Sequence, residues 1–179
     1  YRDTVPSEKS AKPVKGRGMV RELLARPETW QLLIARGMTD PVWYFYLFWF
    51  PKYLISVRHL TDSQMAHFGW VVYLGGGIGT LAGGLLSGTM IRRGMQPGLA
   101  YRRAMSCSAL LVLVSPFAFF APSLMTAVLV ASVVALAHMA WLINLTSVLL
   151  ELYPLAQVGK AAGFVAAGSA LGGMVFSKY

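Results

Sequence analysis

The sequence predicts an all-α membrane protein, a polytopic bundle of about five transmembrane helices. Of its 179 residues, 56% are hydrophobic and only 13% are charged, and the mean hydropathy is +0.55. A helix needs about 20 mainly apolar residues to cross a bilayer, and several segments reach that length. The Lys and Arg residues lie mainly in the N-terminal stretch and in one later loop, between the apolar segments. We therefore interpret the net charge of +9 as membrane topology and expect no nucleic-acid partner.

Residues 1–29 are polar and basic, with Ser, Pro and Gly scattered through the first part. This composition is typical of a flexible linker, and its positive charge places the N-terminal segment in the cytoplasm. From Met19 the apolar spacing predicts a short amphipathic helix on the membrane surface. Pro27 is suited to the first turn of the next helix.

The first predicted span covers residues 30–57 and has an unusual composition. Its segment 40–53, DPVWYFYLFWFPKY, is mostly aromatic, includes an acid and contains two prolines. An acid at membrane depth is costly unless it faces protein or a water-filled cavity, so this helix is expected to line one. Arg36 and Asp40 share a helical face, and their pairing is either structural or functional. Lys52, at the outer end, either attracts an anion or anchors the helix at the interface.

The second predicted span, residues 63–91, contains two rows of glycines. The rows are Gly75, Gly79 and Gly83, and Gly84 with Gly88. Small residues four apart allow a neighbouring helix to approach closely in lipid. A nucleotide-binding loop is disfavoured, because no Walker Lys and Ser follow the glycines. Arg92 and Arg93 follow in a basic loop, where we interpret them as topology and gating residues.

Two further spans are predicted at residues 101–120 and 161–176. The later one is again rich in small residues: Gly159, Gly163, Ala167, Gly168, Gly172 and Gly173. It is expected to pack tightly against a partner helix or to move past one. Cys107 is the only cysteine and has neither a disulfide partner nor a metal motif around it. The sequence predicts no metal site and no cofactor.

The remaining span, residues 124–152, has polar and amphipathic groups in its second half. His138, Trp141 and Asn144 are three residues apart and fall on one stripe. Such a stripe either hydrogen-bonds to neighbouring helices or lines a cavity, and we favour the cavity for the stripe as a whole.

Several of these segments resemble the major facilitator superfamily of transporters. Residues 39–54, TDPVWYFYLFWFPKYL, resemble the seventh transmembrane helix, most closely in the hexuronate transporters of the anion:cation symporter branch. Residues 83–94, GGLLSGTMIRRG, are similar to the loop motif between helices eight and nine, although Gly88 stands where an acid is usual. Residues 141–154 and 159–177 resemble the tenth and eleventh helices. The likeness covers nearly all of the chain after the linker.

The resemblance implies that residues 1–29 join two six-helix halves and that residues 30–179 are the C-terminal half without its last helix. The absent N-terminal half would then supply the arginine for the substrate carboxylate and the acids that couple protons. The implied activity is not enzymatic: proton-coupled uptake of a small organic anion, such as a hexuronate or another sugar acid, by alternating access. The implied location is the bacterial inner membrane.

The substrate site is expected on the aromatic and polar groups of this half. The proposed binding residues are Trp43, Tyr44, Tyr46, Trp141, Asn144 and Ser169, and the possible charge or gating residues are Arg36, Asp40, Lys52, Arg92 and Arg93. Tyr and Trp offer an apolar face and a hydrogen-bond donor, and Asn offers a donor and an acceptor. A membrane-embedded enzyme is disfavoured, because no catalytic cluster is present in the pattern. The alternatives are a non-transport membrane subunit with an assembly role and a transporter of the same fold for another organic anion.

Overall fold

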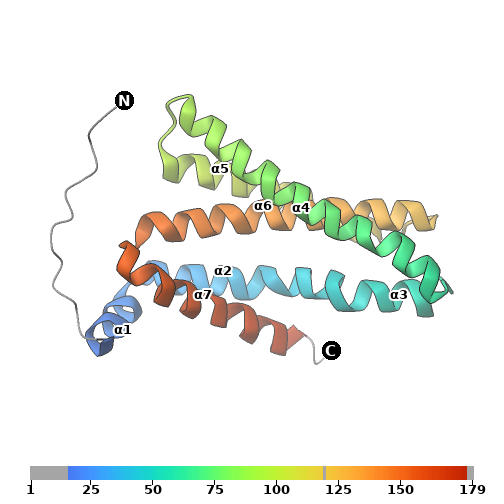
Figure 1. Cartoon of the computed structure of the whole chain (residues 1–179), viewed down its shortest axis with the longest axis horizontal. Helices are drawn as coiled ribbons and strands as arrows, with labels where there is room; N and C mark the ends of the chain where they lie inside the picture. The colour runs from blue at the N-terminus through green and yellow to red at the C-terminus, as the bar shows by residue number, and fades with distance from the viewer. Residues whose placement is uncertain (1–15, 119, 177–179) are drawn as a thin grey trace.

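The computed structural model describes residues 16–118 and 120–176, and this part of the chain forms helices and no strand. The elements are α1 (Gly16–Ala25), α2 (Pro27–Tyr44), the π-helix η1 (Phe45–Trp49), α3 (Phe50–Ser56), α4 (Asp62–Arg92), α5 (Pro97–Val112), the 3-10 turn η2 (Ser115–Ala118), α6 (Leu124–Leu152) and α7 (Leu155–Phe176). Figure 1 shows the long helices lying side by side, with α1 at the end where α6 gives way to α7. The predicted all-α helix bundle is confirmed. The part of the linker at residues 1–15 lies outside the described residues.

Within residues 16–118 and 120–176, three helices are long and apolar enough to cross a membrane: α4, α6 and α7. The rod formed by α2, η1 and α3 runs without a break from Pro27 to Ser56 but carries charged groups within it. Helix α5 has 16 residues. The total of about five spans depends on these last two segments and stays a prediction.

Proline positions explain where the helices differ from the predicted ranges. Helix α7 begins at Leu155 rather than at 161, because the break falls at Pro154 and the following residues are already helical. Helix α5 begins at Pro97, which stands at its first position, rather than at 101. It ends at Val112 rather than at 120, and the chain continues as the 3-10 turn around Pro116. Proline has no backbone N–H to continue a helical ladder.

The first glycine row of α4 packs directly against the backbone of α6. A β-carbon on Gly75 would lie 2.6 Å from the carbonyl oxygen of Ser132, and one on Gly79 would overlap the carbonyl of Leu136. The predicted close approach at this row is therefore confirmed. The second row makes no such contact: a β-carbon on Gly84 would meet nothing within 4 Å in the described structure.

Glycines also allow α2 and α7 to touch. A β-carbon on Gly37 would lie 2.9 Å from the carbonyl oxygen of Gly168, and one on Gly172 would meet the carbonyl of Gly37. In a regular helix that carbonyl would accept a hydrogen bond from residue 41, but Pro41 has no N–H. The Gly37 carbonyl therefore faces Gly172 without its usual donor. The other predicted glycines of α7, Gly159 and Gly163, have nothing within 4 Å of their β-carbon positions in the described structure.

Hydrogen bonds, two of them buried, join α1 and the start of α2 to the turn between α6 and α7. The Thr29 hydroxyl donates to the carbonyl oxygen of Leu23 and accepts from the Tyr153 hydroxyl, each at 2.6 Å. Arg26 donates to the carbonyl oxygen of Leu152 at 3.2 Å, and its guanidinium lies 5.5 Å from the centre of the Tyr153 ring. These contacts tie the amphipathic helix to the bundle.

We expect Thr29→Val to lower the free energy of unfolding by about 1–2 kcal/mol, because valine keeps the shape and leaves Leu23 and Tyr153 without a buried partner. The measurement is thermal unfolding of the intact protein in detergent. Thr146→Val is the matched control, because Thr146 is exposed and bonds only within α6. Equal melting temperatures for the two variants would show that the hydrogen bonds of Thr29 do not stabilise the bundle.

Candidate functional site

The site begins where α2 changes into a π-helix. Pro41 lies inside α2, and the wider turn of η1 follows at Phe45–Trp49. A π-helix inserts extra backbone into the turn, so the side chains beyond it point in new directions. Tyr44, the last residue of α2, faces α7. Tyr46 lies within η1, is buried, and has its hydroxyl 3.3 Å from that of Ser115.

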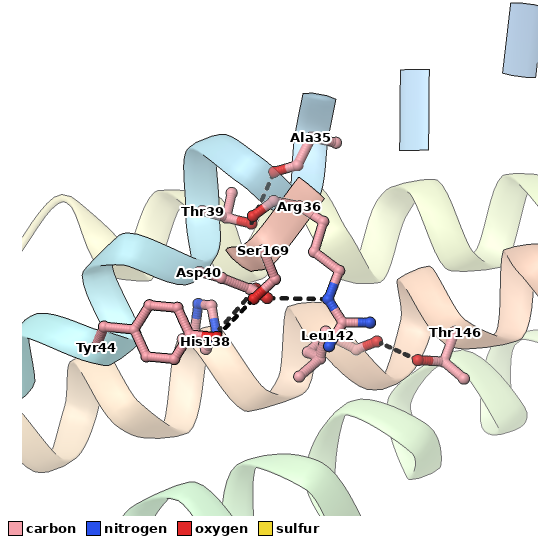
Figure 2. A network of polar contacts seen from close by, with 9 residues as sticks. All are labelled: Ala35, Arg36, Thr39, Asp40, Tyr44, His138, Leu142, Thr146 and Ser169. Carbon is pink, nitrogen blue, oxygen red and sulfur yellow. Dashed lines mark hydrogen bonds and ion pairs between the residues drawn. The ribbon is translucent and has the colours of Figure 1, made fainter. Parts of the chain in front are cut away.

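A network of ionisable groups crosses from α2 to α6 in the middle of the bundle (Figure 2). The Nε of Arg36 donates to Oδ2 of Asp40 at 2.9 Å, and Nε2 of His138 lies 3.7 Å from Oδ1 of the same carboxylate. Asp40 and His138 are each only 4% exposed. Ionisable groups in an apolar bundle are rare, pair with one another and mark functional positions.

A second polar contact joins α2 to α7 next to this network. The hydroxyls of Tyr44 and Ser169 are 2.8 Å apart. Gly173 makes room for the tyrosine, because a β-carbon there would lie 3.0 Å from its ring. Asp40 and Tyr44 are four residues apart and share a helical face, so the charged network and the hydroxyl pair are neighbours.

Two tryptophans surround the imidazole of His138. The ring of Trp43 stacks on it at a centroid distance of 6.0 Å and an interplanar angle of 3°. The ring of Trp141 lies 6.4 Å from it at 27°. Trp43 also meets Tyr73 of α4 edge-on at 6.4 Å. Indole rings from α2 and α6 therefore lie next to the buried histidine, and the ring from α2 also contacts α4.

An aromatic pocket of about 520 Å³ opens beside the hydroxyl pair. It is lined by Met38, Pro41, Val42, Tyr44, Phe45, Tyr46, Phe48, Trp49, Ser115, Gly173 and Phe176. Of the predicted binding residues, Tyr44 and Tyr46 line it. Tyr44 thus connects the pocket to the polar groups.

The structure places the other predicted residues apart from this pocket. Asn144 is 0% exposed, and its amide donates to the carbonyls of Gly83 at 3.1 Å and Ala140 at 2.8 Å. The bond to Gly83 joins α6 to α4, as the interhelical interpretation of the stripe expects, whereas the bond to Ala140 lies within α6. Lys52 is exposed, with its Nζ 4.8 Å from the centre of the Trp49 ring. Arg92 and Arg93 are exposed where α4 ends.

Sequence reasoning missed three contributors: His138 as the partner of Asp40, Ser115 as the partner of Tyr46, and Gly173 as the space for Tyr44. A lone histidine in an apolar helix was the available signal for the first. The other two depend on contacts between helices far apart in the chain. Among the described residues, no group of three or more His, Cys, Asp or Glu side chains is arranged to hold a metal ion.

The comparison with known families agrees with this architecture. Residues 2–177 match the family described as Major Facilitator Superfamily. The chain belongs to the major facilitator superfamily. Together with the three apolar helices long enough to cross a membrane in the described part of the chain, this match indicates an integral membrane protein.

One curated relative of this major facilitator chain is described as "Probable galactarate/D-glucarate transporter GudP", from Pseudomonas putida. It is 27% identical over 92 residues, which are 51% of this chain and 20% of that relative. The match therefore covers about a fifth of the relative's length. No solved structure matches the chain.

Proposed function

We propose that this chain forms the C-terminal half of a proton-coupled symporter that takes up a small organic anion, such as a hexuronate or another sugar acid. The observation that carries the proposal is the buried contact of Arg36, Asp40 and His138 next to the Tyr44–Ser169 pair. Ionisable groups are rare in a bundle of apolar helices, and they commonly mark a substrate or ion pathway. The relative described as a transporter of galactarate and D-glucarate supports a sugar acid as the substrate class.

Each group has a separate part in this proposal. Arg36 uses its Nε on Asp40, and among the described residues its two terminal nitrogens have no hydrogen-bond partner, so they can bind an anionic group. The hydroxyls of Tyr44 and Ser169 can exchange their mutual hydrogen bond for bonds to substrate hydroxyls. The aromatic walls next to Tyr44 offer an apolar surface to the sugar carbon chain.

Alternating access requires a second half, which we propose precedes residue 1 and completes the site at the bilayer midplane. In that arrangement, residues 1–29 form the cytoplasmic linker, and the membrane is the bacterial inner membrane. Asn144, Trp141 and Trp43 support the site by holding α4, α6 and α2 together, while Tyr44, Tyr46 and Ser169 are the groups nearest the substrate. Lys52, Arg92 and Arg93 contribute charge at the two ends.

Uptake of labelled glucuronate, galacturonate and glucarate into proteoliposomes of the intact protein tests this proposal. We expect an inward proton gradient to raise uptake of at least one of them. Tyr44→Phe and Ser169→Ala are expected to weaken uptake by about tenfold each, because a hydrogen bond to a buried polar group contributes about 1–1.5 kcal/mol. Tyr73→Phe and Ser106→Ala, at exposed positions on α4 and α5, are the matched controls.

The outcomes separate the parts of the proposal. No uptake of any sugar acid by well-folded protein would reject the substrate class. Uptake that is equal with and without the proton gradient would reject proton coupling. Unchanged uptake in both Tyr44→Phe and Ser169→Ala would reject the site while keeping the transporter.

A further inference from the structure

We infer that Asp40 and His138 form a proton-binding site in this half of the transporter, and that a proton bound there strengthens the binding of the anion. The inference rests on the proposed function and deepens it. It adds a coupling site on α2 and α6, whereas the family resemblance places the proton-coupling acids in the other half.

Two buried atoms of the pair, Nε2 of His138 and Oδ1 of Asp40, face each other without a hydrogen bond between them. The 3.7 Å between Nε2 of His138 and Oδ1 of Asp40 is longer than a hydrogen bond. Both atoms are buried, and neither has a hydrogen-bond partner in the described residues 16–118 and 120–176. The other carboxylate oxygen is held at 2.9 Å by Arg36. One oxygen of Asp40 is therefore fixed, and the other points at the imidazole.

A proton changes both the contact and the charge of this group. Protonated His138 donates to Oδ1 of Asp40, and charge-assisted bonds of this kind close to about 2.7–2.9 Å. The approach draws α6 towards α2. With neutral histidine, Arg36 and Asp40 cancel, whereas with the proton the three side chains carry a net charge of +1. That charge lies next to Tyr44 and Ser169, where it favours an anion.

Among the described residues, Arg36 is the only other charged side chain that forms an ion pair with the Asp40–His138 pair. Around the pair, α2 contributes Arg36 and the Trp43 ring, α6 contributes the Trp141 ring, and α7 contributes the uncharged Ser169 through Tyr44. Helix α4 contributes the uncharged Tyr73, which contacts Trp43. Since arginine keeps its charge, the proton on the Asp40–His138 pair is the variable charge of the site. Binding of proton and anion must then strengthen each other equally.

Tryptophan fluorescence of the purified protein detects this proton without any substrate. An imidazolium stacked on Trp43 and Trp141 quenches their emission, so we expect a step in emission as the pH is varied between 4 and 9. The step should be present in wild type and in His67→Gln, whose histidine is exposed on α4, and absent in His138→Gln. An unchanged step in folded His138→Gln would overturn the inference.

Transport gives the second readout. In proteoliposomes we expect His138→Gln to lower gradient-driven accumulation, relative to substrate exchange without a gradient, by about tenfold or more. Asp40→Asn keeps the histidine and removes the carboxylate that accepts its proton, so it should lower the same ratio. This variant tests the coupling role if His138→Gln does not fold. A wild-type ratio in either folded variant would overturn the coupling role. If wild type moves no sugar acid, the proposed function fails, while the fluorescence step still decides whether the proton site exists.

Discussion

Replacing Gly79 with alanine is expected to force α4 away from α6 and to destabilise the bundle. The added β-carbon would overlap the carbonyl of Leu136, and backbone cannot rotate aside as a side chain can. On either side of this position, Gly75 and Gly83 make similar contacts, so the whole helix pair must shift. Overpacking of this kind costs about 1–3 kcal/mol. Asn144 would lose its hydrogen bond to the Gly83 carbonyl in the same movement.

The measurement is thermal unfolding of the intact protein in detergent, followed by loss of the monodisperse peak in size-exclusion chromatography. Gly84→Ala is the matched control, because it lies on the same helix and its β-carbon would meet nothing within 4 Å in the described structure. There alanine should be neutral or slightly stabilising, since it forms helices more readily than glycine by about 1 kcal/mol. The same substitution is thus expected to act in opposite directions at two nearby glycines. Equal melting temperatures would show that the close contact does not hold the bundle together.

The features that could be predicted from the sequence are those that depend on spacing within one helix. The four-residue separation of Arg36 and Asp40 indicated their ion pair, and the structure has it at 2.9 Å. The four-residue row Gly75, Gly79 and Gly83 likewise indicated a close helix contact. Both inferences need only the helical period, which the sequence contains.

Contacts between helices could not be predicted in the same way. His138 and Asn144 were assigned to one stripe, yet His138 meets Asp40 of α2 while Asn144 meets Gly83 of α4. A row of residues three apart drifts around the helix, so its two ends reach different neighbours. Which neighbour each end meets depends on how the helices are arranged, and a single sequence does not contain that information.

Helix geometry explains why the aromatic residues of the first span separate. Trp43, Tyr44 and Tyr46 were expected to gather in one site. In the structure they face α6, α7 and η2 respectively. Trp43 and Tyr44 are consecutive residues of α2, so their side chains point about 100° apart. Tyr46 lies within the wider turn of η1 at Phe45–Trp49, where the regular period is broken, and only the prolines indicated such a departure. The predicted substrate site is therefore divided into a pocket side and a buried side.

Arg36→Gln is expected to be the most damaging charge substitution in the described part of the chain. It would leave the Asp40 carboxylate, which is 4% exposed, without its fixed cation. Breaking a buried ion pair by removing one partner costs about 3–5 kcal/mol, because the remaining charge is neither solvated nor paired. Thermal unfolding of the intact protein in detergent measures the loss. Arg102→Gln is the control, since Arg102 is exposed on α5 and its replacement should change stability by less than about 0.5 kcal/mol.

The double variant Arg36→Gln/Asp40→Asn decides whether the loss comes from the unpaired charge. Two neutral amides of similar shape can hydrogen-bond to each other, so we expect the double variant to recover at least half of the stability that Arg36→Gln loses. Acid should also reduce the defect of the single variant, because protonated His138 can then pair with Asp40 in place of Arg36. A double variant as unstable as the sum of the two single ones would show that the residues act independently. Recovery of stability without recovery of uptake is the result we expect, because the refolded site would lack both the cation for the anion and the carboxylate that shares the proton.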